Sequence, residues 1–311
     1  MTGPGLETVQ HLVTALLNLA VAVLAGASVS RLWLGRDASR WAAVRRDPIR
    51  KAAAAAGVAA LLANLAWLWL EAAAMAEVPV TQAAGAAWAM LSSTHLGFAG
   101  CIGTIALVLA LGPAFVRDGR SAKPPLLTLA ALAAFWYTRS MVSHAASDGD
   151  LSVRLLADWV HLGLISLWLG EVIVSAGVMS RTAGGMGGAD RRARAAYVAS
   201  LSSSATFALA GIFATGLYAA WRSLGGFDKL TGNAYANTLV AKLLLVGLAA
   251  LLGGFNRFAV MPPWLACESA GEAAPAHFPI RFRRILLTEA LVLMAAVVAA
   301  AWLASTSPPG D

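Results

Sequence analysis

Long apolar stretches follow one another along almost the whole of this 311-residue chain, and they restrict its fold more than any other feature. Hydrophobic residues make up 59% of the sequence and charged residues only 13%, against about 25% charged in an ordinary soluble domain. Because about 20 apolar residues in a helix cross the hydrocarbon core of a bilayer, each stretch is long enough to span a membrane. The sequence therefore predicts an all-α integral membrane protein with the lipid bilayer as its solvent.

We predict a single polytopic membrane domain over residues 1–311, built as a bundle of about eight transmembrane helices. The connections between the apolar stretches are short, so neighbours in sequence are expected to pack antiparallel. The segment from Pro262 to Pro279 is expected to be an irregular loop. The predicted helices cover residues 8–34, 52–76, 83–115, 125–145, 153–179, 195–221, 236–260 and 284–305.

Arginine and lysine gather in alternate loops of this predicted bundle. One group lies between Arg36 and Lys51, and others lie around Arg120, Arg192 and Arg283. Loops rich in these residues stay on the cytoplasmic side of a membrane, so both termini are predicted to be periplasmic. The net charge of +7 thus comes from loop residues that set the orientation of the protein in the membrane, and no nucleic-acid partner is expected. No nucleotide-binding motif or nucleophile–base pair occurs, which argues against an enzyme.

Four of the five histidines are expected on the outer side of the bundle. His11, His144 and His161 fall at or just below the outer membrane surface. His95 falls about 18 Å down, near the midplane, at a rise of 1.5 Å per residue. Ionisable side chains inside a bilayer are costly and usually functional. Taken singly, His11 or His95 is more typical of a hydrogen bond between helices, but the shared side of the four histidines favours a metal site reached from outside.

Met141 and His144 are three residues apart at the end of one predicted helix. A thioether beside an imidazole suits Cu(I), a soft ion, better than magnesium or calcium. The alternative is that Met141 is ordinary apolar packing. Asp148 and Asp150, in the loop that follows, are expected to attract cations to the site.

Asp158 and His161 are also three residues apart, so their side chains share one helix face. A carboxylate in this position can accept one imidazole N–H and leave the other ring nitrogen free for a metal. The alternative is that Asp158 pairs with Arg154 or with Arg139 of the neighbouring helix.

Further acidic and basic residues lie within the predicted helices. Lys242 and Glu71 fall on the outer side, where Lys242 is a candidate counter-ion for Asp158 or Glu71. Glu171 and Glu289 fall toward the cytoplasmic side. We interpret them as partners of interfacial arginines, with an inner station on a transport pathway as the alternative.

Several short motifs follow one another in the second half of the chain. In chain order they are Ser143–Ala145 (SHA), Leu155–Leu162 (LLADWVHL), Leu167–Gly170 (LWLG), Leu239–Leu244 (LVAKLL), Asn256–Phe258 (NRF) and Arg283–Ala290 (RRILLTEA). Their order and spacing resemble those of the copper resistance protein D (CopD) family, most clearly over residues 140–305. This sequence has Ser143 and Glu171 at two positions where the family commonly has glycine.

The resemblance implies an eight-helix protein of the bacterial inner membrane that handles copper from the periplasmic side. It carries over best to His144 and His161, with Asp158, Lys242 and Glu289 as accompanying polar residues. It also implies copper resistance or transport as the function, with a periplasmic copper chaperone as a candidate partner.

Residues and resemblance together predict a membrane protein that takes up a copper ion, Cu(I) or Cu(II), from the periplasmic side and stores it or passes it inward. Two alternatives remain: a redox protein with a bis-histidine haem, and a non-catalytic assembly protein with structural histidines. The predicted metal ligands are His144, His161, His11, His95 and Met141, with Asp158, Lys242 and Glu71 as supporting residues.

Overall fold

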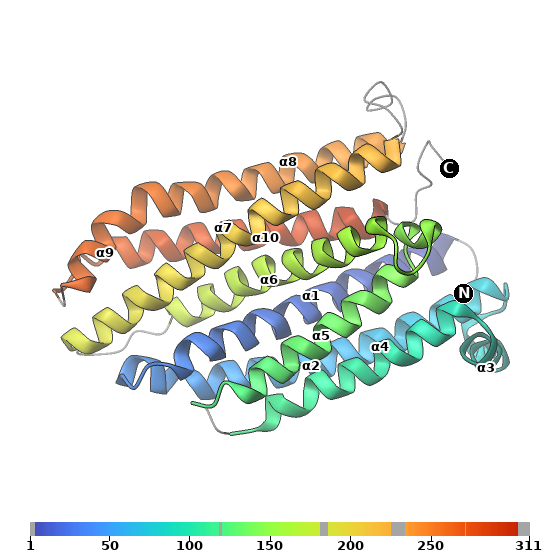
Figure 1. Ribbon diagram of the computed structural model, residues 1–311, viewed down its shortest axis with the longest axis horizontal. Helices are drawn as coiled ribbons and strands as arrows, with labels where there is room; N and C mark the ends of the chain where they lie inside the picture. Colours follow the sequence, from blue (N-terminus) through green and yellow to red (C-terminus); the bar gives the residue numbers. More distant parts are fainter. Residues whose placement is uncertain (1–3, 118–119, 181–185, 225–233, 271, 304–311) are drawn as a thin grey trace.

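The computed structural model describes residues 4–117, 120–180, 186–224, 234–270 and 272–303. All regular structure in these ranges is helical, as the apolar pattern predicts. The long helices lie side by side in one bundle (Figure 1). They are α1 (Pro4–Gly35), α2 (Arg40–Met75), α4 (His95–Leu111), α5 (Lys123–Met141), α6 (Val153–Ser180), α7 (Gly188–Leu224), α8 (Ala234–Phe255) and α10 (His277–Leu303). The short elements are η1 (Val80–Gln82), α3 (Ala84–Ser93), η2 (Gly112–Phe115), η3 (His144–Asp148), the π-helix η5 (Asn256–Val260) and α9 (Met261–Ser269).

Within the described ranges, 7 helical stretches are long and apolar enough to cross a membrane. The chain is thus a multi-pass membrane protein. The remaining predicted span corresponds to α5, which has 19 residues and lies alongside the others in Figure 1. The candidate spans cover residues 5–35, 40–75, 95–115, 153–180, 188–222, 240–269 and 277–301.

The two ends of the bundle differ in their elements and in their charge. At one end, called the His144 end below, α1 begins, α10 ends, and α3 and η3 lie (Figure 1). The opposite end, the α9 end, is rich in arginine. There the buried guanidinium of Arg45 donates to the carbonyls of Trp41 and Val178, and Arg31 donates to Pro113 and Val116. Two of these carbonyls, of Val178 and Val116, lie at the ends of α6 and η2, where no helical N–H reaches them.

The backbones of α1 and α6 touch where they cross. A Cβ atom added to Gly26 would lie 2.0 Å from the carbonyl carbon of Gly170, and one added to Gly170 would lie 1.8 Å from the Ala22 oxygen. Small residues let membrane helices approach closely and pack by van der Waals contact. This contact fixes the depth of α6 beside α1.

The helix predicted over residues 83–115 is two helices, because the chain breaks at Thr94. This residue is extended (φ −117°, ψ 154°), and its hydroxyl accepts a hydrogen bond from Gly97 N at 2.9 Å, which caps the start of α4. Thr94 also donates to the Met90 carbonyl at 2.8 Å, at the end of α3. The Thr94 cap therefore ends one helix and begins another within a stretch that the hydrophobic pattern alone predicts to be a single helix.

The prediction of an irregular loop from Pro262 to Pro279 is wrong over much of that segment. The chain leaves α8 through η5 and continues as α9, and α10 already begins at His277. Pro262 and Pro263 are accommodated because they occupy the first turn of α9, where the missing N–H groups cost no helical hydrogen bond.

The contact between α1 and α6 leads to a first prediction. Gly26→Ala should lower the free energy of unfolding by about 1–3 kcal/mol, because backbone atoms at 2.0 Å cannot move aside as a side chain does. The measurement is thermal unfolding of the purified protein in detergent. Gly177→Ala in α6, the partner helix, is the control, since a Cβ there meets no atom within 4 Å. Equal melting temperatures for the two variants would contradict the close contact.

Candidate functional site

A cavity of about 330 Å³ opens toward the His144 end of the bundle and is called the His144 cavity below. Residues of α1, α5, α6, α7, α8, α10 and η3 line it. Four predicted site residues contribute to its wall: His144, Asp158, His161 and Lys242. The structure therefore brings together, from three separate elements, four of the five residues to which the resemblance carried over, and the fifth, Glu289, does not line this cavity.

The His161 ring is held by α7. Its Nδ1 lies 2.8 Å from Thr215 Oγ1, and the Thr215 hydroxyl donates its single proton to the Gly211 carbonyl at 2.7 Å. With the Thr215 hydroxyl proton on the Gly211 carbonyl, we assign the neutral ring the tautomer in which Nδ1 donates to Thr215 and Nε2 carries the lone pair. Gly216 gives the ring room, because a Cβ there would lie 3.2 Å from His161 Cε1. An oriented imidazole with a free nitrogen is suited to bind a metal ion.

Asp158 has different partners from those predicted. Its Oδ2 accepts hydrogen bonds from Ser140 Oγ at 2.8 Å and Ser143 Oγ at 3.2 Å. The prediction that Asp158 orients His161 is wrong, because Thr215 of the neighbouring helix reaches Nδ1 instead. Asp158 instead joins the end of α5 to α6, next to the cavity.

Basic and acidic groups around the cavity compensate one another. Lys242 and Arg139 are the positive charges that act on Asp158. Arg139 is also attracted by Glu71, and its guanidinium lies over the Trp67 ring at 4.0 Å. Glu71 does not line the cavity, so its contribution to the site passes through Arg139. Buried charges are tolerated only when paired in this way.

His95 is not near the midplane, so the predicted depth is wrong. Because the helix breaks at Thr94, His95 is the first residue of α4, and its side chain is 52% exposed. Its Nε2 lies 3.0 Å from Asp150 Oδ2 in the loop between η3 and α6. The structure thus places His95 at the surface of the His144 end, in contact with a carboxylate.

Met141 and His11 do not line the His144 cavity either. Met141 is buried in an apolar cluster with Ala99 and Leu155. His11 lies on α1 one turn before Thr14, which is the first cavity residue of that helix. Among the described residues, no group of three or more His, Cys, Asp or Glu side chains is close enough to hold a metal ion.

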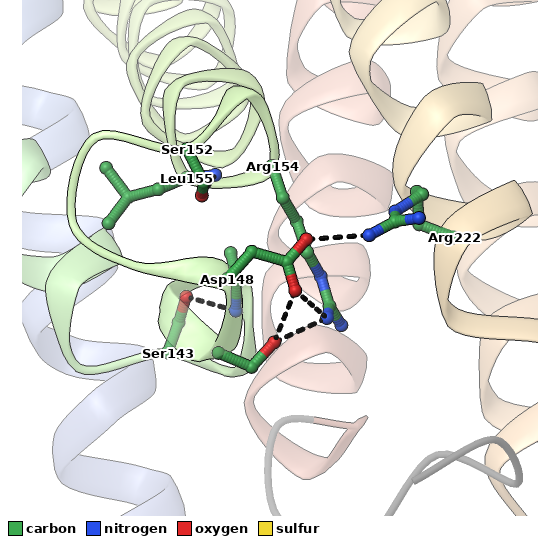
Figure 2. A network of polar contacts seen from close by, with 8 residues as sticks. Ser143, Asp148, Ser152, Arg154, Leu155 and Arg222 are labelled. Carbon is green, nitrogen blue, oxygen red and sulfur yellow. Dashed lines mark hydrogen bonds and ion pairs between the residues drawn. The ribbon is translucent and has the colours of Figure 1, made fainter.

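A network of polar contacts holds the segment between α5 and α6, which contains η3, at the mouth of the cavity (Figure 2). The Asp148 carboxylate lies between two guanidinium groups, 2.6 Å from Arg222 Nη2 and 3.8 Å from Arg154 Nη1. Arg154 also donates to Ser147 Oγ at 2.7 Å. Asp148 therefore ties η3 to both α6 and α7, and its charge is already compensated, in contrast to the predicted role of attracting cations.

Thr215 and Gly216 are the site residues that the sequence analysis missed. They lie in an apolar stretch of α7 without any recognisable motif. The only available signal was the pairing of two small residues within a membrane helix, which is typical of a helix–helix contact. That signal indicates where helices approach, but it does not identify the histidine that is bound there.

The helical bundle, its candidate spans and a cavity walled by histidines define a multi-pass membrane protein with a polar site at one end. Residues 195–303 match the family described as Copper resistance protein D, and residues 6–153 match Copper resistance protein D-like, N-terminal domain. The two matches lie one after the other and cover most of the sequence. The chain belongs to the copper resistance protein D family, a family of membrane proteins implicated in copper resistance. No curated protein and no solved structure matches it.

The network at the mouth leads to a prediction about pH. The hydrogen bond from Arg222 lowers the pKa of Asp148 below its ordinary value of about 4, and the charges of Arg222 and Arg154 act in the same direction. A lowered pKa in the folded state means that the pairing is intact at neutral pH and is lost only as the pH falls through that lowered value. Amide protection of η3 should therefore stay constant from pH 7 to about pH 4 and decrease below it.

The variant Asp148→Asn should lose this protection already at pH 7, as measured by hydrogen exchange of residues 144–153. Asp150→Asn is the matched control. It removes a carboxylate from the same loop, but the Asp150 backbone carbonyl still accepts the Tyr137 hydroxyl at 2.6 Å. Similar exchange in the two variants would contradict the assigned role of Asp148.

Proposed function

We propose that this protein binds a copper ion in the His144 cavity and passes it inward across the membrane. The observation that supports this most is the His161 imidazole, whose Nδ1 contacts Thr215 at 2.8 Å and which lines the same cavity as His144. Imidazole is a common ligand of copper, and the family is implicated in copper resistance. Copper is here the cargo, and no catalytic step is assigned.

His144 and His161 are the proposed ligands. His161 is fixed by α7, whereas His144 begins the short helix η3 and is exposed. His11, His95 and Met141 do not line the cavity and are not part of the proposed site.

The charges around the cavity favour Cu(I) over Cu(II). Its acidic and basic side chains already compensate one another, so a bound ion adds its own charge to the cavity. In a poorly solvated site, the free-energy cost of an uncompensated charge rises steeply with the magnitude of that charge. A monovalent, soft ion held by two imidazoles therefore fits this environment better than a divalent one.

The direction of copper movement follows from the charge of the two ends. We place the arginine-rich α9 end in the cytoplasm, as the positive-inside rule requires. The His144 cavity then faces the periplasm of a bacterial inner membrane, with both termini on that side. A periplasmic copper chaperone is the proposed donor.

The ligand assignment is tested with His161→Ala and His144→Ala. Both variants should lose bound copper after the purified protein is loaded with Cu(I) and desalted, as measured by metal analysis. His95→Ala is the control, because His95 lies at the same end but contacts Asp150 instead of the cavity. Retention of copper by His161→Ala would refute the proposal, and a Soret band in the visible spectrum would select the haem alternative.

The orientation of His161 gives a separate prediction. Thr215→Val removes the acceptor of the Nδ1 proton at nearly constant volume, and copper affinity should fall about 10- to 100-fold. The measurement is competition with a Cu(I) chelator. Thr288→Val is the control, since Thr288 makes the same kind of bond to the carbonyl four residues earlier but is exposed on α10. Equal affinities for both variants would show that Thr215 does not position His161.

A further inference from the structure

A second cavity, of about 230 Å³, lies between α6, α7, α8, η5 and α10, and is called the Glu289 cavity below. It extends toward the α9 end of the bundle, because it includes residues of η5 and the first residue of α9. Most of its wall is apolar. Its polar side chains are those of Glu289, Asn256, Ser202, Thr206 and Arg257, and Met261 adds a thioether. The Ser202 and Thr206 hydroxyls already bond to Arg257 and to the Ser202 carbonyl, which leaves a carboxylate, an amide and a thioether as candidate ligands.

Glu289 is buried in this wall, with 2% of its surface exposed. Its Oε1 accepts a hydrogen bond from Trp168 Nε1 at 3.0 Å. Within the described ranges no ion pair joins Glu289 to a basic side chain, and Arg257, which shares the cavity, donates to Ser202 instead. A buried carboxylate held only by a neutral donor is either protonated or completed by a cation, and Glu289 faces a cavity with room for a cation.

Asn256 provides an independent sign of a missing partner. It lies at the start of the π-helix η5, is 3% exposed, and donates from Nδ2 to the Phe282 carbonyl at 3.4 Å. Its Oδ1 is buried and accepts no hydrogen bond from any described residue. Buried oxygen atoms nearly always have a partner, and single π-helical turns occur often at functional sites.

Two consecutive residues of α6, Trp168 and Leu169, line different cavities and lie between them. Leu169 lines the His144 cavity and its neighbour Trp168 lines the Glu289 cavity, and both side chains are almost completely buried. His161 and Trp168 are seven residues apart, which corresponds to about 10 Å along the helix. The two cavities therefore follow one another along α6, and the hydrogen bond from Trp168 to Glu289 lies where they adjoin.

We propose that the Glu289 cavity is a second, weaker binding site for the same soft monovalent cation, which reaches it after the His144 cavity. This inference rests on the proposed copper transport. Glu289, Asn256 and Met261 supply the ligands. Two oxygen donors bind a soft ion less tightly than two imidazoles, and conduction requires such a site from which the ion can leave.

The test uses Ag⁺, a soft monovalent ion that undergoes no redox change, and calorimetric titration of the purified full-length protein. The wild type should bind two ions with unequal affinity. Glu289→Gln should abolish the weaker site and change the affinity of the tighter site less than about twofold, whereas His161→Ala should abolish the tighter site. Glu171→Gln is the matched control, because Glu171 is equally buried on α6 with Ser204 as its partner but lies outside the cavity wall.

A milder variant covers the case in which Glu289→Gln does not fold. A Cβ at Gly253 would lie 3.2 Å from Glu289 Oε1, so Gly253→Ala should displace the carboxylate and weaken the second site about tenfold or less. Gly247→Ala in the same helix is its control, since its Cβ meets no atom within 4 Å.

The two proposals fail in different ways. A weaker site that survives in Glu289→Gln, or an equal loss in Glu171→Gln, would overturn the second site. A tighter site that survives in His161→Ala would overturn the first. In proteoliposomes, Glu289→Gln should slow copper transport about tenfold or more while the tighter site still binds, and an unchanged rate would remove the Glu289 cavity from the pathway.

Discussion

The close approach of α1 and α6 at Gly26 and Gly170 determines where the polar groups of this protein lie. The α6 helix carries Asp158 and His161 in its first half and Trp168 just beyond, so its depth beside α1 sets the position of both cavities. In a bilayer, helices gain little from burying apolar surface against one another, and close backbone contact replaces that driving force. The site is therefore positioned by packing rather than by the polar residues themselves.

Charge compensation is the second constraint. Every charged group close to the His144 cavity has a partner of opposite sign, and Glu71 takes part from outside the cavity through Arg139. Such pairing lets polar residues remain in a membrane protein without unfolding it, but it leaves little capacity for a further charge. The same arrangement therefore favours the monovalent cargo that we propose.

The helical class and most spans could be predicted because lipid imposes a strong pattern on sequence. Thr94 and Pro262 show where this pattern is insufficient, since a side-chain cap divides one apolar run and a proline fits the first turn of another helix. The motifs located His144 and His161 correctly on one cavity. Spacing along a single helix suggested Asp158 as the partner of His161, but the actual partner comes from another helix, and contacts between helices leave no period in the sequence.

The position of His144 on η3, outside every long helix, has one further consequence. His161 cannot turn without breaking its bond to α7, whereas His144 is exposed at the first residue of η3, whose other end is tied to α6 and α7 through Asp148. In the copper site that we propose, His161 is therefore the fixed ligand and His144 the one that a delivering protein reaches first. Ligand exchange through His144 would pass the ion on without its release into water.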